Sequence, residues 1–564
     1  MVDSRIEGSD YIADAKKHNE WWDGELSDLS DVASYDPRSD FLQVLRRIDT
    51  HRREGVESLV YPIYGPTGIG KTTLLKQFIA AVVSEDNYSP GHRDLDIFGA
   101  VDPRQILYVP LEESLYHLER AEDAVEQLYS VIDYFRTHVC PRGEISYVLL
   151  DDIGALRLDE DQKQNLFDIV DDRTYLLLTG VVTSQVDVED VPGSERIDEV
   201  EWARPMLPMK FADTVQLNLY DETSLEEAEP ELVDRIESLR TSSVEGESLI
   251  REVRSHLSSP AELPTAVEAL NQLYFEVLSA HERDLLHEAA REYLQRGGFF
   301  RRVDDSAVEN ELTRSHLLLY LYKELARYES IQHPENLHRL SSLAASHAGE
   351  ELRYTDISDQ LELNRRTLDS YLKILDEGLS VSESHDFSLQ RHRRTRLYLR
   401  NPRHVVLLSQ RQEHYGFEDG DPTRVLNHEF EYKLARTVVF DHAKRLAYAV
   451  DPTGGGDHEV EYCETEAGTV DYILRNEGFV LPFVLSYHPN SKDAEAIVAA
   501  FDPTAGKHPK PDTEDLQNFD YEAPYRFIVT DSLPQEVKKS ESLVRDQGET
   551  KHCYLPYWLF LLIC

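Results

Sequence analysis

Cysteine is scarce in this sequence, and apolar runs long enough to cross a membrane are lacking. Cys140, Cys463, Cys553 and Cys564 lie far apart and form no Cys-x-x-Cys pair, so the sequence predicts neither a zinc site nor a disulfide framework. The N-terminal sequence has no apolar signal core. Tyr554–Cys564 is strongly apolar but only about half as long as a bilayer-spanning helix, and we expect a final buried strand there. We therefore expect a cytoplasmic protein.

Basic residues are the second shortage. The chain has 106 Asp and Glu residues against 59 Lys and Arg, a formal net charge of −47, and only 16 of the basic residues are lysines. A diffuse acidic surface repels itself in dilute salt, and added salt screens that repulsion. The composition resembles that of proteins from salt-accumulating halophiles, so we expect a halophilic protein; an ordinary acidic protein is the alternative. Acidic dominance excludes broad coating of nucleic acid, and any DNA contact must be local.

The sharpest motif that is present is a phosphate-binding loop. Gly65–Thr72 (GPTGIGKT) matches GxxxxGK[ST] and lies between an expected strand, Leu59–Tyr64, and an expected helix, Thr72–Val83. Backbone N–H groups and the helix N-terminus bind phosphates in such a loop. Lys71 is positioned for the β- and γ-phosphates of ATP, and the Thr72 hydroxyl for Mg²⁺. The predicted nucleotide-binding residues are Gly65, Pro66, Thr67, Gly68, Ile69, Gly70, Lys71, Thr72 and Thr73.

Two carboxylates follow a second apolar strand. Tyr147–Leu150 precedes Asp151 and Asp152, at the strand end where ligands bind in parallel sheets. We expect Asp151 to complete the Mg²⁺ shell with Thr72, and Asp152 to polarise the attacking water. Thr179, which ends another apolar strand, is a candidate for a hydrogen bond to the γ-phosphate or to water. Alternatively, Asp-Asp at a strand end caps a helix, and the threonine is a turn residue.

The order of apolar segments predicts the fold. Strands are expected at 59–64, 106–111, 147–150, 175–179 and 215–219, alternating with helices as in a parallel sheet covered on both faces. The segment from 221 to 349 has helical periodicity throughout, and 401–564 returns to strands mixed with helices. The expected class is therefore a multidomain α/β protein built on a P-loop NTPase sheet.

Residues 350–400 contain a helix-turn-helix pattern followed by a basic hairpin. Apolar residues are spaced as the cores of two helices around a turn at Leu363 and Asn364. A second helix toward the major groove and an arginine-rich wing on the phosphates is one interpretation. An intramolecular surface that faces acidic helices is the other. The nucleic-acid candidates are Arg365, Arg366, Arg391, Arg393, Arg394 and Arg396.

Several short motifs, in order along the chain, carry a family resemblance. Residues 36–564 resemble archaeal and bacterial AAA+ ATPases that couple a P-loop domain to a C-terminal nuclease-like domain of unknown function. Besides the P-loop and YVLLDD, Tyr293–Phe299 resembles the family's YLxxGGFP element, although Phe300 replaces its proline. Asp356–Val381 resembles its helix-turn-helix, Arg396–Arg400 the strand that opens its last domain, and Leu555–Phe560 its closing strand.

The resemblance divides the chain into five segments: an acidic arm (1–35), an AAA+ P-loop ATPase core (36–220), a helical lid (221–349), a winged helix-turn-helix (350–400) and a degenerate PD-(D/E)XK, or restriction-endonuclease-like, α/β domain (401–564). It also implies an arginine before the fifth strand that reaches a neighbouring subunit's γ-phosphate. Lys210 stands at that point here, and Arg204 and Arg196 are nearby substitutes. Lysine lacks the bidentate fork of arginine.

The last domain lacks residues that the resemblance implies for a nuclease. Glu431 matches the family's early acid and Asp471 its strand acid, but Val484 and Ser486 occupy the positions of the Glu-x-Lys pair. Valine ligates no metal and serine carries no charge, so two-carboxylate metal catalysis has lost its scaffold. We therefore expect a slow, Mg²⁺-dependent ATPase, acting as a switch on DNA or on a partner protein, and no nuclease activity. A nucleotide-binding scaffold or sensor that barely hydrolyses ATP is the alternative.

Overall fold

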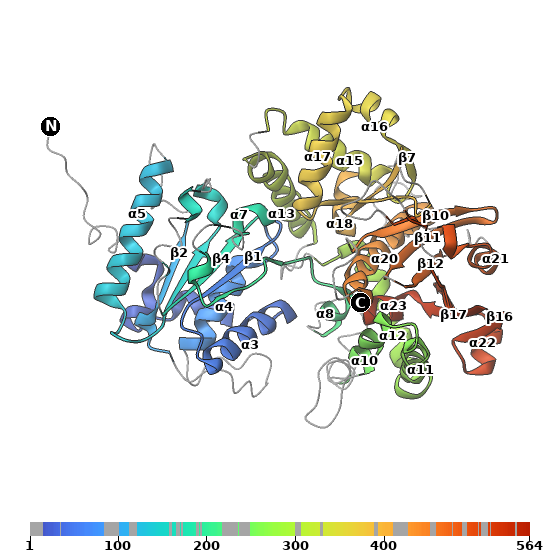
Figure 1. The fold of residues 1–564 in the computed structure, drawn as a ribbon, viewed down its shortest axis with the longest axis horizontal. Helices are drawn as coiled ribbons and strands as arrows, with labels where there is room; N and C mark the ends of the chain where they lie inside the picture. Colours follow the sequence, from blue (N-terminus) through green and yellow to red (C-terminus); the bar gives the residue numbers. More distant parts are fainter. Residues whose placement is uncertain are drawn as a thin grey trace. The chain divides into compact units, whose positions relative to one another are not determined.

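The computed structural model describes the chain except for residues 1–14, 34, 36, 84–100, 112–120, 157–160, 165–169, 171–172, 188–190, 192–193, 217–234, 236–248, 299–305, 328–330, 389–392, 410–426, 452–457, 477, 488–492, 506, 509–516, 519–520 and 548–549. The chain forms two compact units (Figure 1). Unit 1 comprises Met1–Leu207 with Glu377–Leu379, and unit 2 comprises Pro208–Asp376 with Ser380–Cys564. None of the described helices is long and apolar enough to span a membrane.

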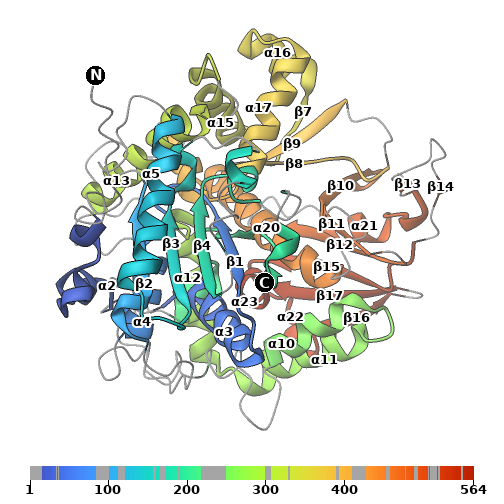
Figure 2. The same ribbon diagram turned by 60° about the vertical axis from the view of Figure 1, so that its left-hand side comes forward.

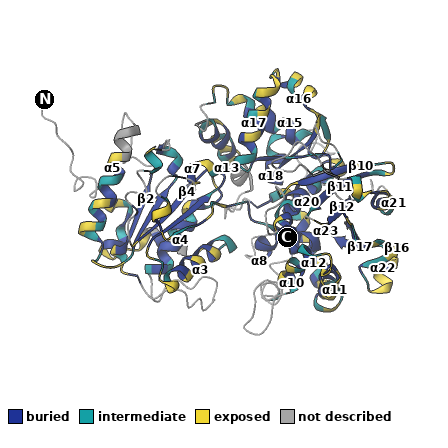
Figure 3. Ribbon diagram, viewed as in Figure 1, coloured by how far each residue is buried: buried dark blue, intermediate teal, exposed yellow. Residues whose placement is uncertain are grey.

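Unit 1 is built on a parallel sheet with the order β2-β3-β4-β1-β5 (Figure 2). The strands are β1 (Leu59–Tyr64), β2 (Ile106–Pro110), β3 (Ser146–Asp151), β4 (Thr174–Gly180) and β5 (Glu199–Val200), and β6 (Arg204–Pro205) also pairs with β1. Every residue of β2, β3 and β4 is buried, as Figure 3 shows by colour. Such continuous apolar runs are typical of strands covered on both faces. The predicted α/β class with a parallel sheet is confirmed.

Helices connect these strands. α3 (Ser39–Glu54) precedes β1, α4 (Lys71–Val83) follows it, and α5 (Ala121–Tyr134) with the π-helical turn η6 (Phe135–Val139) follows β2. Short helical turns, η4 (Pro103–Gln105), η7 (Ile153–Leu156), α7 (Thr183–Val186) and η8 (Ser194–Arg196), lie in the connections. The register aligns Pro110 with Asp151 and Tyr64 with Gly180, so the carboxyl ends of four neighbouring strands form one edge of the sheet.

The fifth strand is not where the sequence predicted it. We expected a strand at 215–219, but Phe211–Gln216 forms helix α8 in unit 2, and 217–219 lie outside the described residues. All five residues from Phe211 to Val215 are buried, so burial in this segment is continuous. A short apolar run does not by itself distinguish strand from helix. The strand beside β1 is β5, only two residues long.

The N-terminal arm, which the sequence predicted only as an acidic segment, packs in part against the rest of unit 1. Its described part contains η1 (Lys16–His18), η2 (Glu20–Asp23) and α2 (Ser27–Ala33). Ala15, Trp21, Trp22 and Leu29 are buried, which accounts for the docking because each removes apolar surface from water. Acidic composition concealed these four anchors.

Unit 2 begins with helices, as the periodicity predicted. They are α8, α10 (Leu249–Ser255), η9 (His256–Ser258), α11 (Leu263–Gln272), η10 (Leu273–Val277), α12 (Ala280–Arg296), α13 (Ser306–Leu319), η11 (Tyr320–Glu324), α14 (Leu325–Arg327) and α15 (Glu335–Ser346). The Ser279 hydroxyl accepts from Glu282 N at 3.2 Å and the Glu282 carboxylate accepts from Ser279 N at 2.7 Å, a capping box that begins α12.

Two short helices and a small antiparallel sheet follow. β7 (Glu351–Arg353), α16 (Tyr354–Leu361), α17 (Arg365–Glu377), β8 (Val381–Ser384) and β9 (Arg394–Leu399) give a sheet of order β7-β9-β8. Glu362 has a φ of 58°, which ends α16, and the Asn364 side chain accepts from Thr367 N at 3.0 Å at the start of α17. The turn between the two helices is therefore defined by an αL residue and an N-cap.

The C-terminal part of unit 2 is a mixed sheet of order β10-β11-β12-β15-β17-β16. Its strands are β10 (Val460–Thr465), β11 (Gly468–Arg475), β12 (Val480–Ser486), β15 (Tyr525–Thr530), β16 (Val544–Gln547) and β17 (Thr550–Pro556). Its helices are α18 (Pro402–Leu408), α20 (His428–Val450), α21 (Ala494–Ala499), α22 (Gln535–Ser540) and α23 (Tyr557–Ile563), and β13 (Lys507–His508) pairs with β14 (Gln517–Asn518).

The expected final strand at 554–564 is wrong beyond Pro556. β17 ends there, and Tyr557–Ile563 is helical and wholly buried. A helix that is apolar on every side is buried all round, and the composition alone did not separate it from a buried strand.

Burial of His442 makes unit 2 sensitive to acid. The ring is 0% exposed in α20, Nδ1 lies 2.8 Å from Val438 O, and Nε2 lies 3.2 Å from Phe211 N. Burial, together with the positive charge of nearby Arg445, lowers the pKa of His442 to about 3. The unfolded chain therefore binds a proton near pH 6.5 while the folded chain does not, and stability falls as the pH drops from about 6.5 toward 3.

We expect wild type to lose roughly 2 kcal/mol of unfolding free energy between pH 7 and pH 5 through this residue. His442→Gln, which keeps a donor and an acceptor but does not titrate, should lose that much less over the same interval. Urea unfolding of both full-length proteins at the two pH values measures the difference. Equal losses in the two proteins would show that another group causes the acid sensitivity.

Candidate functional site

The P-loop has the backbone shape that binds phosphate. Gly68 and Gly70 have φ of 77° and 105°, values that favour glycine. A Cβ added to Gly65 would lie 2.4 Å from Met206 O, so the loop tolerates no larger residue there without movement. α4 begins at Lys71 directly after the loop. A glycine turn followed by a helix N-terminus is an arrangement that can hold a phosphate group.

Lys71 is buried beneath its own loop. The Nζ atom donates to Gly65 O at 2.7 Å and to Pro66 O at 3.2 Å, and the residue is 9% exposed. The ammonium group therefore lies at the concave side of the loop.

Asp151 is the centre of a hydrogen-bonded cluster at the carboxyl edge of the sheet. Its Oδ2 accepts from Thr72 Oγ1 at 2.6 Å and from the Tyr108 hydroxyl at 2.8 Å, and its Oδ1 accepts from Thr179 Oγ1 at 2.8 Å. α4, β2, β3 and β4 each contribute one side chain. The predicted Thr72–Asp151 pair is thus in contact, with oxygen ligands of the kind that Mg²⁺ prefers.

Thr179 and Asp152 are joined to this cluster. The Thr179 hydroxyl, while donating to Asp151, accepts from Asp152 N at 2.8 Å. Asp152 follows β3 with a φ of 61°, an uncommon backbone conformation for a residue with a side chain. Strained positions of this kind cluster at functional sites. The sequence predicted Thr179 as a contact of phosphate or water, and in the structure its hydroxyl orients both carboxyl-bearing residues.

Sequence reasoning missed two residues of this region. Tyr108 lies in the apolar run of β2, and the sequence therefore indicated only a buried core residue. Arg38 donates from Nη1 to Ile69 O at 2.8 Å and from Nη2 to Leu207 O at 2.6 Å, and so braces the P-loop from the segment that precedes α3. Its position directly before a helix carried no sequence signal for this role.

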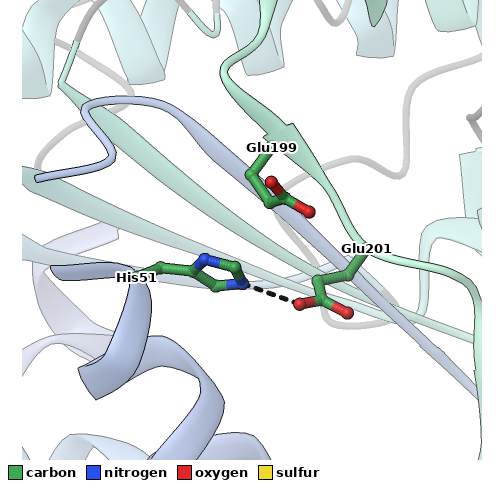
Figure 4. A group of neighbouring side chains, drawn as sticks. All are labelled: His51, Glu199 and Glu201. Carbon is green, nitrogen blue, oxygen red and sulfur yellow. Dashed lines mark hydrogen bonds and ion pairs between the residues drawn. The ribbon is translucent and has the colours of Figure 1, made fainter. Parts of the chain in front are cut away.

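A second cluster of potential ligands lies at the opposite edge of the sheet (Figure 4). His51, Glu199 and Glu201 place ligand atoms within 4.8 Å of one another, and His51 Nε2 lies 2.7 Å from Glu201 Oε1. Leu59, the first residue of β1, pairs with Glu199, which identifies the amino edge.

Two arginines already neutralise Glu201. Its carboxylate contacts the Arg47 guanidinium and lies 3.3 Å from Arg204 Nη2. Burial alone would raise the pKa of Glu201, but hydrogen bonds from His51 and Arg47 outweigh it, and the pKa lies below its usual range. With two guanidinium groups in place, a metal cation is disfavoured, and the cluster is an ion-pair network that joins α3 to β5.

The three candidates for a contact in trans have different surroundings. Lys210 Nζ donates to Cys564 O at 2.9 Å within unit 2. Arg204 is bonded to Glu201. Arg196 is exposed and ends η8, directly before β5. Because the fifth strand is at 199–200, the arginine that precedes it is Arg196, and Lys210 precedes a helix.

Four of the basic candidates in the second unit are exposed and differ in their ion pairs. Arg366 and Arg393 form no ion pair with any residue that the structure describes. Arg394 pairs with Glu351 at 2.5 Å, and Arg365 pairs with Asp369 at 2.8 Å. Arg391 lies outside the described residues.

The prediction that Arg396 contacts nucleic acid is wrong, because this residue is only 4% exposed and does not form part of a basic surface. Nη1 lies 3.6 Å from Asp471 Oδ1, Nη2 lies 3.3 Å from Glu464, and the guanidinium covers the Tyr462 ring at 4.1 Å. Position 396 is the third residue of β9, and the last five residues of that strand are all buried, Arg396 among them.

The acids expected of a nuclease are used in internal contacts. Tyr472 pairs with Phe483, so Asp471 lies beside Val484, and its Oδ2 accepts from Leu485 N at 2.9 Å. Glu431 accepts from the Tyr487 hydroxyl at 2.9 Å and lies 3.3 Å from Arg291. The cation beside Asp471 is therefore Arg396, supplied by the protein itself.

Residues 287–405 match the model of a family described as a domain of unknown function, DUF8612. No curated protein matches the sequence.

Among solved structures, the chain is similar to the Aeropyrum pernix ORC1 protein in complex with DNA, with 13% identity, 67% of this chain and 93% of that chain covered, and a TM-score of 0.29. The Aeropyrum pernix ORC2 protein, in ADPNP–ADP complexes, is 15% identical over 67% and 96% of the two chains, with a TM-score of 0.31. A DNA polymerase III gamma subunit-related protein of Thermotoga maritima is 14% identical over 49% and 91%, with a TM-score of 0.20. These TM-scores are too low to carry information on function, which rests on the chain's own residues.

Proposed function

We propose that the chain is an AAA+-class ATPase that binds ATP with Mg²⁺ through Gly65–Thr73 and hydrolyses it slowly as a conformational switch. The observation that carries the proposal is the 2.6 Å contact between the P-loop hydroxyl of Thr72 and Asp151, made beside a loop that holds the Lys71 ammonium. A glycine-rich turn that bound no nucleotide would require neither the Asp151 carboxylate beside Thr72 nor the Lys71 ammonium within the loop.

Each residue has a defined task in this proposal. The loop N–H groups and Lys71 bind the terminal phosphates, and Thr72 with Asp151 holds Mg²⁺, which supplies charge neutralisation of the phosphates. Asp152 orients the attacking water. Its side chain is one methylene shorter than glutamate, which is why slow turnover is expected. Thr179 holds Asp151 and Asp152 in a common orientation through its two hydrogen bonds.

Arg196 is the residue that we propose to act in trans. β5 runs parallel to β1, so a residue directly before β5 lies at the amino edge of the sheet, away from the P-loop of the same chain. An exposed arginine there has no route to its own nucleotide, but it can reach the nucleotide of a neighbouring copy. Slow hydrolysis by isolated chains, faster when chains assemble, is the consequence.

DNA is the partner that we propose for the segment 350–400 as a winged helix. Arg366 in the first turn of α17 and Arg393 beside β9 are the exposed cations that support this role. Arg394 is partly neutralised by Glu351. Binding through so few phosphate contacts weakens as salt rises. A protein partner with an acidic surface is the alternative for the same residues.

We further propose that the C-terminal domain has a binding or structural role and does not cleave DNA. Arg396 neutralises Asp471, and Val484 offers no ligand beside it. One carboxylate cannot hold a metal and also orient water and the leaving phosphate. Cleavage of linear or single-stranded DNA with Mn²⁺ that disappears in Asp471→Ala would contradict this proposal.

The function is tested by phosphate release from ATP and Mg²⁺ over a series of potassium chloride concentrations, with and without duplex DNA, because phosphate contacts weaken as salt rises. We expect slow turnover that DNA changes at least severalfold, and no change with DNA in the Arg366→Glu, Arg393→Glu double variant. Tight ATP binding with no phosphate release under either condition would favour the scaffold or sensor. Absence of both binding and release would reject the nucleotide site.

A further inference from the structure

We propose that the docked N-terminal segment, Ala15–Gly24, sets the orientation of Asp151 through Tyr108, and thereby controls the Mg²⁺ requirement of the ATPase. The inference rests on the proposed function, since Asp151 matters in this way only if it takes part in binding Mg²⁺. The contacts run from Asn19 to the backbone of Tyr108, and from the Tyr108 hydroxyl to Asp151.

Asn19 acts as a short substitute for a strand beside β2. Among the strands that the structure describes, β2 lies at the edge of the sheet and pairs only with β3. The Asn19 side chain accepts from Tyr108 N at 2.7 Å and donates to Tyr108 O at 2.8 Å. Both outward backbone groups of Tyr108 are therefore bonded to one amide, which is itself 0% exposed and also donates to Ala15 O at 2.7 Å. A buried two-point bond of this kind fixes backbone position and direction.

Two tryptophans hold the segment in place. Trp22 is 8% exposed, donates from Nε1 to Ile106 O at 2.7 Å, and stacks on Phe135 with ring centroids 5.7 Å apart. Trp21 is 3% exposed. Ile106 O and the Tyr108 backbone point to the same side of β2, because residues two apart share a direction along a strand. The segment thus binds successive outward groups of the strand.

The Tyr108 hydroxyl shares one oxygen of Asp151 with Thr72. Both donate to Oδ2, at 2.8 and 2.6 Å, while Thr179 donates to Oδ1. Thr72 is also the residue whose hydroxyl is proposed to ligate Mg²⁺. If the Thr72 hydroxyl ligated Mg²⁺ through a lone pair, it could still donate its proton to Asp151, and Tyr108 and Thr179 would supply the other two hydrogen bonds to the carboxylate. Tyr108 is therefore a positioning residue for the metal-binding pair.

Loss of this hydroxyl should raise the Mg²⁺ requirement without changing affinity for ATP itself. Partners that orient a metal-binding side chain typically change metal affinity by 10-fold or more. We expect Tyr108→Phe to need about tenfold more Mg²⁺ for half-maximal phosphate release at saturating ATP. ATP affinity measured in EDTA should match that of wild type, since the P-loop contacts are untouched.

Tyr175→Phe is the matched control. Tyr175 is equally buried in the same sheet, and its hydroxyl donates at the same 2.8 Å distance, to Val56 O. It lies at the start of β4, paired with Leu59, and so at the edge remote from Asp151. The two tyrosine variants should lose similar stability. Of these two, only Tyr108→Phe should shift the Mg²⁺ titration. Asn19→Ala should shift it in the same direction, by a smaller factor.

The experiment measures Mg²⁺-dependent phosphate release and fluorescent-ATP binding for the full chain and these three variants, with melting temperatures. A wild type that neither binds Mg–ATP nor releases phosphate rejects the proposed function. An active wild type with the same Mg²⁺ titration as Tyr108→Phe overturns this inference and leaves the function standing. Equal shifts of the Mg²⁺ titration in Tyr108→Phe and Tyr175→Phe would mean that lost stability causes the effect, and would overturn the positioning role of Tyr108. A shift in Tyr108→Phe with none in Asn19→Ala would overturn control by the N-terminal segment.

Discussion

Lys71→Ala is expected to lower the rate of ATP hydrolysis at least 100-fold, about 3 kcal/mol of transition-state stabilisation. The ammonium group lies at the concave side of the P-loop, 2.7 Å from Gly65 O, where it would face the terminal phosphates. Its charge has no substitute among the other P-loop residues, Gly65–Gly70, Thr72 and Thr73, which are uncharged. Tight binding of ATP should weaken as well, because ground-state phosphate contacts are lost together with transition-state contacts.

Lys76→Ala, one turn further along α4, supplies the control for removal of a positive charge from the same helix. Phosphate release and ATP affinity should be those of wild type in that variant. Hydrolysis by Lys71→Ala at the wild-type rate would mean that ATP is bound elsewhere, and would remove the basis for the assignment of Gly65–Thr73.

Asp151→Asn should abolish Mg²⁺-stimulated turnover, with a loss of about 100-fold or more, while ATP binding in EDTA persists. The substitution keeps the shape of the side chain but removes its negative charge and turns one acceptor into a donor. On Oδ2, that donor would face the hydroxyls of both Thr72 and Tyr108. The variant therefore separates the metal-binding role of the residue from simple packing.

Asp198→Asn is its counterpart, because the Asp198 carboxylate accepts from Glu57 N at 2.8 Å and Ser58 N at 3.0 Å at the amino edge of the sheet. A change in turnover there would indicate a global effect. If instead Asp151→Asn retains Mg²⁺ stimulation, another carboxylate holds the metal and the Thr72–Asp151 pair is structural.

The sequence was informative where the constraints on structure lie in contiguous residues. The strand and helix that flank the glycine turn, and the end of β3 at Asp151, were predicted correctly, because glycines and apolar runs stand side by side. The same holds for α16 and α17, whose apolar spacing and turn residues are local. In each case one short window contains all the physical constraints that produce the element.

Failures arose where structure depends on distant residues. β5 has two residues and no apolar run to mark it, whereas Val215 belongs to a stronger apolar pattern that is helical. Arg396 was grouped with its basic neighbours, but it is buried in β9 and lies beside Asp471, 75 positions later in numbering. Tyr108 donates a hydrogen bond to Asp151 across a sequence separation of 43 residues, and no motif near either residue indicates this contact.

The amide of Asn19 has a further consequence for the behaviour of the protein in solution. An uncovered edge strand offers its N–H and C=O groups to any other extended chain, and proteins protect such edges to avoid association. On the outer side of β2, Tyr108 N and O are taken by one side-chain amide, and Ile106 O by Trp22. The segment that orients Asp151 thus also blocks addition of a further strand to the sheet. Its detachment would leave the edge of β2 open to association with other chains and would leave the Asp151 carboxylate less well oriented.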